Sequence, residues 1–395
     1  MCDEEHDAIV IGAGPAGLMA ADALASRGFP PVVLEAMPSP ARKFLMAGKS
    51  GLNLTKQEET AKFLAAYGNV PPHFRQMIDD FGAERVSEFA KNLGQELFVG
   101  STGRVFPKQM KASPLLRSWL NRLDSKGAEL RRRSRWLGWH KGALVLDTHG
   151  TKYRIQPKVC VFALGGGSWA KLGSNGDWVS IFEQRGISLA PLKPSNSGVS
   201  IAWSEYMDRH FGTPLKSIRA SAGQLQSRAE MIITKTGLEG GGIYELTPEI
   251  RDGSRLFLDL KPDVGLDELK NRLARSPRKA SQNTVLRKQA GLSEAAIAVL
   301  QEFSRPLPRG PELAERIKHI EVEVSGLRPI DEAISTAGGV DWVALDDRLM
   351  LKKLPGAFVA GEMLNWEAPT GGYLLTACFA TGYFAGQAAA DQLEQ

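Results

Sequence analysis

The segment HDAIVIGAGPAGLMAADALASRGFPPVVLEA, residues 6–36, constrains the fold of this chain more than any other. An apolar run, Ala8 to Ile11, leads into the turn Gly12 to Gly17, and residues with helical spacing follow. Gly12 permits a tight turn, Gly14 lets the backbone approach a pyrophosphate, and Gly17 lets helix and strand pack closely. The segment therefore predicts a strand, a turn, a helix whose N-terminus faces the phosphates of a dinucleotide, and a second strand.

A carboxylate stands at the end of that second strand. Glu35 lies eighteen residues past Gly17 and closes the run VVLE. A carboxylate at this position suits the two hydroxyls of an adenosine ribose and would repel a 2′-phosphate, so FAD or NAD fits better than NADP.

Two later segments favour FAD. ARKFLMAGKSGLNLT, residues 41–55, places Arg42 and Lys43 just after the ribose carboxylate and ends in a Gly/Ser loop with Asn53 and Thr55. We interpret it as a second surface for phosphate and ring contacts, with an ordinary charged surface loop as the alternative. In VCVFALGGG, residues 159–167, the run to Leu164 predicts a buried parallel strand, and the glycines predict a turn near the nucleotide.

The chain ends in an unusual stretch, because the 23 residues from Ala368 to Ala390 carry no charge. Before it we expect a strand at Ala357 to Ala360 and a turn at Gly361-Glu362, and Gly371-Gly372 opens a helix of small residues. This order of strand, turn and helix repeats that of the N-terminal segment. We expect the acidic turn to contact a ribityl-pyrophosphate and the N-terminus of the helix to face the pyrimidine edge of a flavin. A membrane span fits the length but not the composition, since glycines and a proline interrupt it and large aliphatic residues are few.

Composition sets further bounds. The chain has 395 residues, of which 43% are hydrophobic, so it can bury a large core. The acidic N-terminus lacks the basic and apolar regions of a secretory signal, so we expect a cytoplasmic protein. The cysteines are three, widely spaced and without a CxxC, and the histidines have no ligand-like spacing. We therefore expect neither a disulfide framework nor a metal site. No second GxGxxG follows, so any NAD(P)H must reach the flavin directly.

The formal charge of +5 is unevenly spread along the sequence. Lys261 to Ala290 holds eight Lys or Arg residues against three acidic ones, and Arg131 to Arg135 reads RRRSR. Two interpretations stay open: solvated helix faces, or a surface for an anionic or nucleic-acid partner through Lys261 to Lys288. No RNA- or DNA-binding motif decides between them.

Together these motifs, with GRVFP (103–107), GGGSWAKLGSNGDW (165–178) and STAGGV (335–340), make the chain resemble a bacterial family of flavoproteins. Its members are variously named aminoacetone-oxidase-like, bile-acid ene-reductase-like and ribosomal RNA dihydrouridine synthase. The resemblance implies an α/β fold, with a Rossmann-like FAD-binding domain of glutathione-reductase type at 1–191 and 330–395. It also implies an insert, β-barrel-like at 192–265 and 311–329 and helical at 266–310. Ser281 or Ser293 could cap helices there.

We expect one noncovalently bound FAD, with NAD(P)H as an electron donor. The residues expected to bind FAD are Gly12, Ala13, Gly14, Pro15, Ala16, Gly17, Glu35, Ala36, Arg42, Lys43, Ser50, Asn53, Thr55, Trp136, Ala163, Gly165, Gly361, Glu362, Gly371, Gly372 and Tyr373. The chain departs from the family in one place. Where many members have Arg-Cys-Asn, it has Gly51, Leu52 and Asn53, so a cysteine proton donor is impossible there.

Three functions remain open. The first is reduction or dehydrogenation of a C=C or C–C bond in a small molecule, linked to NAD(P)H. The second is an amine-type oxidase that uses oxygen. The third is an RNA-binding flavoprotein. We expect the insert to set substrate choice, with Asn196 and Tyr244 as catalytic candidates beside Ser195 and Glu239. Asn196 can donate and accept a hydrogen bond, and Tyr244 could protonate a carbanion. An ordinary turn or core role is the alternative for each.

Overall fold

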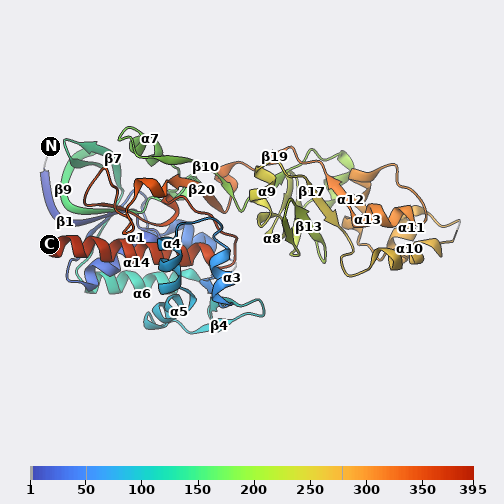
Figure 1. Ribbon diagram of the computed structural model, residues 1–395, viewed down its shortest axis with the longest axis horizontal. Helices are drawn as coiled ribbons and strands as arrows, with labels where there is room; N and C mark the ends of the chain where they lie inside the picture. Colours follow the sequence, from blue (N-terminus) through green and yellow to red (C-terminus); the bar gives the residue numbers. More distant parts are fainter. Residues whose placement is uncertain (1–2, 50, 278) are drawn as a thin grey trace. The chain divides into compact units, whose positions relative to one another are not determined.

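The computed structural model describes residues 3–49, 51–277 and 279–395, which fall into two compact units (Figure 1). The first unit joins Met1–Lys193 to Ser335–Gln395, and the second is Pro194–Ile334. Each unit has its own cluster of buried apolar side chains. Two separate cores are what two domains that can each fold around their own interior require.

In the described part of the chain, the first unit contains a seven-stranded sheet in the order β6-β2-β1-β9-β8-β7, with β21 also paired to β9. The contacts of β1 with β2 and β9, of β2 with β6 and of β9 with β21 are parallel, whereas β7, β8 and β9 pair antiparallel. The strands are β1 (Asp3–Ile11), β2 (Val32–Glu35), β6 (Glu129–Arg132), β7 (Ser134–His140), β8 (Ala143–Thr148), β9 (Thr151–Phe162) and β21 (Ala357–Val359). This parallel core with crossover helices confirms the predicted Rossmann-like α/β class.

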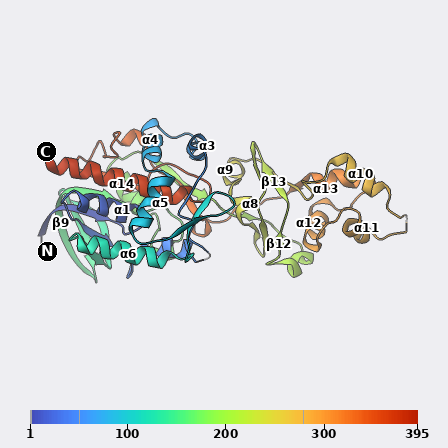
Figure 2. The same ribbon diagram turned by 90° about the horizontal axis from the view of Figure 1, so that it is seen from below.

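The N-terminal and C-terminal parts of the chain meet in this unit. Helix α1 (Pro15–Ser26) lies alongside α14 (Tyr373–Glu394), which runs past it in both views (Figures 1 and 2). A Cβ added at Gly382 would lie 2.3 Å from the carbonyl oxygen of Ala16, and one at Gly386 would lie 2.5 Å from that of Ala20. The small residues of the C-terminal stretch therefore let two helix backbones touch.

The remaining elements of the first unit surround this sheet. Its other helices are α2 (Arg42–Ala47), α3 (Thr60–Ala65), α4 (Pro72–Asp80), α5 (Ala83–Asn92), α6 (Ala112–Ser125) and α7 (Trp178–Glu183). Two small sheets complete it: β3 (Thr55–Lys56), β5 (Arg104–Pro107) and β4 (Leu97–Val99) form one, and β10 (Leu189–Ser195) and β20 (Ser335–Val340) form the other.

The second unit combines two antiparallel sheets with helices. One sheet has the order β12 (Pro214–Leu215), β15 (Met231–Thr234), β16 (Gly237–Glu239), β11 (Val199–Ser200) and β19 (Gly326–Leu327). The other has the order β14 (Leu225–Ser227), β13 (Arg219–Ala222), β17 (Leu256–Asp259) and β18 (Ile320–Val322). The helices are α8 (Gly241–Tyr244), α9 (Thr247–Arg251), α10 (Leu266–Ala274), α11 (Gln282–Lys288), α12 (Glu294–Ser304) and α13 (Glu312–Lys318).

Two helices of this unit begin at the expected caps. The side chain of Ser281 accepts a hydrogen bond from the backbone N–H of Thr284, and that of Ser293 accepts one from Ala296. Each bond satisfies one of the N–H groups that the first turn of a helix leaves without a helical partner. Both serine caps are therefore confirmed.

The C-terminal helix raised the question of a membrane span. Among the helices of the described residues, none combines the length and the apolar character needed to cross a bilayer.

Candidate cofactor-binding site

The glycine turn between β1 and α1 is shaped by backbone contacts. Gly12 has a φ of +101°, and a Cβ there would lie 2.3 Å from the carbonyl oxygen of Ala163. A Cβ at Gly17 would lie 1.8 Å from the carbonyl oxygen of Gly12. By contrast, a Cβ built at Gly14 would meet no described atom within 4 Å beyond those of Gly14 and its two chain neighbours. Gly12 and Gly17 are thus required by the fold, whereas Gly14 borders open space at the N-terminus of α1.

Glu35 is attached to this turn. Its Oε2 accepts a hydrogen bond from the backbone N–H of Ala13 at 3.1 Å, and its Oε1 accepts one from Met37 at 2.8 Å. Burial raises the pKa of Glu35, although these two hydrogen bonds and the charge of Arg42 act in the opposite direction. A carboxylate oxygen can accept more than one hydrogen bond, so the two oxygens of Glu35 can also accept hydrogen bonds from ribose hydroxyls.

Glu362 connects three distant segments. Its Oε2 accepts a hydrogen bond from Lys43 Nζ at 2.8 Å and one from the N–H of Gly166 at 3.3 Å. Its Oε1 accepts one from the N–H of Thr336 at 3.0 Å. Lys43 also donates to Ser168 Oγ at 2.5 Å. The carboxylate therefore holds α2, the loop after β9 and strand β20 around the turn that follows β21.

We expect this ion pair to contribute to the stability of the first unit. The side chains of Lys43 and Glu362 are 28% and 14% exposed, against 62% and 76% for the surface pair Lys108 and Glu96. A double-mutant cycle with Lys43→Met and Glu362→Gln should give a coupling energy of about 1–3 kcal/mol. The cycle with Lys108→Met and Glu96→Gln should give at most ~1 kcal/mol. Urea unfolding of the flavin-free protein measures both, and equal coupling in the two pairs would contradict the expectation.

Several buried polar atoms of this unit have no hydrogen-bond partner among the described residues. They include Arg42 Nε, Asn53 Oδ1, Trp136 Nε1 and Ser174 Oγ. Buried polar atoms usually have partners, so such a group calls for a bound molecule or water. Arg42, Asn53 and Trp136 all belong to the residues expected at FAD. The open space at Gly14 and the atoms of Arg42 and Asn53 are compatible with bound FAD. Trp119 Nε1 and Trp136 Nε1, which also have no partner among the described residues, lie in the core.

The N-terminus of α14 lies directly against β3. A Cβ at Gly372, whose φ is +108°, would lie 2.4 Å from the backbone carbon of Thr55. The hydroxyls of Thr55 and Thr376 are 2.8 Å apart and buried. This close approach brings two segments together, 41–55 and 361–386, that were each expected to contact the flavin.

The first residue of α14 is held by a charged pair. Lys56 Nζ donates to the hydroxyl of Tyr373 at 2.9 Å and lies 2.9 Å from Glu58 Oε2, and the Tyr373 hydroxyl donates to Glu58 Oε1. The lysine ammonium also lies 5.2 Å from the centre of the Tyr373 ring. The hydroxyl of Tyr373 is thus engaged within the protein, and a contact of this residue with FAD stays a prediction.

The other expected FAD residues lie in different surroundings. Ser50 lies outside the described residues. Trp136, in β7, packs in the core against Trp139, Phe162 and Phe182. Seven further residues lie near the ends of helices or strands: Pro15 and Ala16 at the start of α1, Ala36 after β2, Ala163 and Gly165 after β9, Gly361 after β21, and Gly371 before α14. Their contacts with FAD also stay predictions. Leu52, at the position of the family cysteine, is completely buried.

Two residues of this site were not expected. Ser168 receives the Lys43 hydrogen bond, and Thr336 Oγ1 accepts one from the N–H of Gly167 at 2.9 Å. A Cβ at Gly166 would lie 2.4 Å from Thr336 Oγ1, so the glycine run and the hydroxyl fit each other. Ser168 and Thr336 belong to the motifs GGGSW and STAGGV. A hydroxyl residue next to a run of glycines is the sequence feature that could have predicted them.

The catalytic candidates lie in the second unit. Asn196 is 2% exposed, has a φ of +53°, and its carbonyl accepts a hydrogen bond from the N–H of Ile334 at 3.1 Å. Ser195 is also buried, and Tyr244 and Glu239 are half-buried. Burial raises the pKa of Tyr244, and the nearby charge of Glu239 raises it further. The Tyr244 hydroxyl therefore keeps its proton through neutral pH.

Comparison with known proteins now decides the family. A model described as the HI0933-like protein Rossmann domain matches residues 6–388. The chain belongs to the HI0933-like family. It is accordingly an FAD-dependent oxidoreductase. When bound, FAD supplies the acceptor or donor of a hydride, and the protein supplies position, electrostatics and access.

Relatives of known name match over almost their full length. A 3-dehydro-bile acid delta(4,6)-reductase of Clostridium scindens is 27% identical over 97% of this chain and 98% of that protein. A ribosomal RNA dihydrouridine synthase of Escherichia coli is 24% identical over 94% of each. One of the same name from Haemophilus influenzae is 26% identical over 95% and 96%.

Solved structures share the fold. A flavocytochrome c3 fumarate reductase has a TM-score of 0.55 at 16% identity, covering 99% of this chain and 79% of that one. A 3-ketosteroid-delta4-(5alpha)-dehydrogenase from Rhodococcus jostii has a TM-score of 0.54 at 16% identity, covering 99% and 97%.

Proposed function

We propose that this HI0933-like protein uses FAD to reduce a C=C bond conjugated to a carbonyl group, with NAD(P)H as the source of electrons. The observation that carries the proposal is common to the named relatives. A delta(4,6)-reductase of a 3-dehydro-bile acid and a synthase of dihydrouridine both add hydrogen across a C=C bond next to a carbonyl. The substrate class here is accordingly an α,β-unsaturated carbonyl compound.

Such a reduction adds a hydride to the β-carbon and a proton to the α-carbon. The proton needs an acid that stays protonated at neutral pH. The raised pKa of Tyr244 is compatible with that role, and Leu52 removes the cysteine that many family members have for it. We assign proton donation to Tyr244 and substrate positioning to Asn196.

Anaerobic flavin spectra test the proposed reaction. NADH or NADPH should bleach the bound flavin within one turnover, and an enone such as 4-androstene-3,17-dione should restore its colour. Bleaching by a primary amine, with restoration by oxygen, would instead support an amine-type oxidase. If neither donor bleaches the flavin, the reductase proposal is wrong.

Replacing Tyr244 tests the proton donor. Tyr244→Phe should slow the re-oxidation by enone about 100-fold while the FAD content stays unchanged, because a positioned general acid contributes about 10²–10⁴-fold. Tyr206→Phe is the matched control, since Tyr206 is 72% exposed in the same unit. Loss of FAD from the Tyr244 and Asn196 variants alike would show that these residues belong to the cofactor site instead.

A second candidate substrate is uracil within ribosomal RNA, which the names of two relatives favour. The basic segment gives it partial support. Lys270 pairs with Glu315 at 2.7 Å, Arg272 pairs with Glu268, and Lys261 Nζ donates to the carbonyl of Gly291. These partners offset much of the local charge, and Arg278 lies outside the described residues.

The salt dependence of RNA binding separates the two substrates. If the basic segment contacts phosphates, affinity for ribosomal RNA fragments should fall steeply with salt. Charge reversal at Arg275 and Lys279 should reduce the slope by about 2, since each phosphate contact contributes roughly one. Lys91→Glu, an exposed site in the first unit, should leave it unchanged. No binding to these fragments or to a random duplex at about 50 mM salt would exclude RNA.

A further inference from the structure

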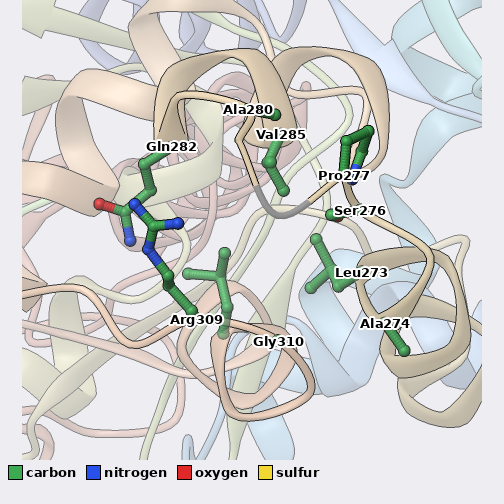
Figure 3. Close-up of a pocket in the computed structure, with 10 residues that line it drawn as sticks. Leu273, Ala274, Ser276, Pro277, Ala280, Gln282, Val285, Arg309 and Gly310 are labelled. Carbon is green, nitrogen blue, oxygen red and sulfur yellow. The ribbon is translucent and has the colours of Figure 1, made fainter.

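A pocket lies in the helical part of the second unit (Figure 3). Its volume is about 200 Å³. Leu273, Pro277, Val285 and Leu313 give it apolar walls from α10, α11, α13 and the α10–α11 loop, and Arg309 stands at its edge. None of its lining residues is assigned to FAD or to the proposed reaction.

The size of the pocket limits what it accepts. Sites for drug-sized molecules are about 300–1,000 Å³, whereas an apolar cavity of about 150 Å³ binds benzene. A pocket of about 200 Å³ therefore takes one or two fused rings and excludes a four-ring steroid. It is not a second site for the substrates named for the bile-acid relative.

Polar groups at this pocket are available to a ligand. Ser276 Oγ is buried and has no hydrogen-bond partner among the described residues. Gln282 Nε2 donates to the carbonyls of Leu307 and Pro308 at 3.1 and 3.0 Å, which orients the side-chain amide. Figure 3 shows the head groups of Gln282 and Arg309 on one side and Ser276 with Pro277 on the other. A ring with polar edges would find partners on both sides.

Basic side chains line the pocket or stand next to its lining residues in the sequence. Arg275, Lys279 and Arg309 are exposed, and none of them forms an ion pair within the described ranges. Lys270 and Arg272, on the neighbouring helix α10, are paired with Glu315 and Glu268. Lys288 on α11 is also exposed and forms no ion pair within the described ranges, but it does not line the pocket. The cation that an anion at the pocket would meet is therefore Arg309, which lines it. Arginine suits phosphate because its guanidinium can donate two parallel hydrogen bonds.

We propose that this pocket binds a nucleotide, with the base between the apolar walls and its phosphate at Arg309. Flat bases are commonly held between apolar side chains and recognised by hydrogen bonds at their edges. A free mononucleotide and a nucleotide unstacked from RNA present the same chemistry. The site goes beyond the proposed reductase activity and does not depend on it.

Binding is measured on the full-length, FAD-loaded protein by calorimetry. The probes are uridine 5′-monophosphate, inorganic phosphate, an RNA hairpin with one bulged uridine, and the same hairpin fully paired. Val285→Trp fills the pocket and should weaken binding of the nucleotide or bulged hairpin at least tenfold. Arg309→Ala, at an exposed position that should not affect folding, should weaken it about tenfold. Lys288→Ala, exposed on the same helix α11 and outside the pocket, should change it less than twofold.

Each outcome decides the proposal. Binding of free nucleotide that the two pocket variants weaken supports the site with a small-molecule source. Binding of the bulged hairpin alone, weakened by the same variants, supports it with RNA as the source. Binding of inorganic phosphate as tight as that of nucleotide overturns it, as does equal weakening by Arg309→Ala and Lys288→Ala. Binding of no probe also overturns it. Unchanged flavin re-oxidation in these variants distinguishes this site from the proposed active site.

Discussion

Gly14→Val should abolish FAD binding while leaving the protein folded. Beyond its two chain neighbours, a Cβ at this position meets no described atom within 4 Å, so the fold has room for the side chain. That room is where the pyrophosphate of a dinucleotide approaches the turn. We expect affinity for FAD to fall more than about 100-fold, which is about 2.8 kcal/mol. Flavin absorbance of the purified protein and FAD titration of the flavin-free form measure the loss.

Two other glycines provide the controls for this prediction. Gly265→Val also enters open space, at the start of α10 in the second unit, and should keep its flavin. Gly17→Val should instead prevent folding, because its Cβ would lie 1.8 Å from the carbonyl oxygen of Gly12. A Gly14→Val protein that purifies with full flavin content would refute the placement of the pyrophosphate.

Gly382→Ala should destabilise the first unit by about 3 kcal/mol or more. Intrinsic helix propensity predicts the reverse, since alanine favours a helix over glycine by about 1 kcal/mol. The contact with Ala16 decides whether the substitution stabilises or destabilises the protein. The added methyl group would lie 2.3 Å from the carbonyl oxygen of Ala16 and 3.0 Å from two other backbone atoms of that residue. Backbone atoms of a packed helix cannot move aside as a flexible side chain can.

Urea unfolding of the flavin-free protein measures this effect. Gln392→Ala, at an exposed site on the same helix, should change stability by less than about 0.5 kcal/mol. A Gly382→Ala protein more stable than the parent would mean that α1 and α14 are not in backbone contact.

The two glycine predictions concern different properties of one surface. Gly14 affects the ligand, because it borders space that the fold leaves open. Gly382 affects the fold, because the carbonyl of Ala16 already occupies the space beside it. The same spacing of small residues in a sequence thus has opposite consequences, and only the contacts distinguish them.

Several residues that were expected to bind FAD instead contact other side chains of the protein. Lys43 and Glu362 were each expected to bind FAD, and the structure places them 2.8 Å apart. Tyr373 was expected at the flavin, and its hydroxyl contacts Lys56 and Glu58, for which no role was foreseen. These side chains organise the backbone around the site, whereas Arg42 Nε and Asn53 Oδ1 are buried with no hydrogen-bond partner among the described residues. Their contacts with FAD stay predictions.

The sequence of the basic segment, Lys261 to Lys288, also could not predict which of its charges are paired. Its composition alone left both solvation and an anionic partner open. The structure pairs Lys270 and Arg272 with acidic residues, whereas Arg275 and Lys279 are exposed, form no ion pair within the described ranges and adjoin in sequence the pocket residues Ser276 and Ala280. A count of charges cannot separate these cases, because an acidic partner such as Glu315 lies far along the chain and reaches Lys270 only through the packing of α10 against α13.

The sequence by itself determined the α/β class, the turn at Gly12 to Gly17 and the serine caps of α11 and α12. These features depend on residues close together in the chain, since a tight turn needs glycine and a helix start needs a side-chain acceptor. Tertiary structure alone decided that Glu362 would hold Lys43, Gly166 and Thr336 together. Those contacts depend on which strand ends meet at one edge of the sheet, and the order of strands is set by packing across the whole unit.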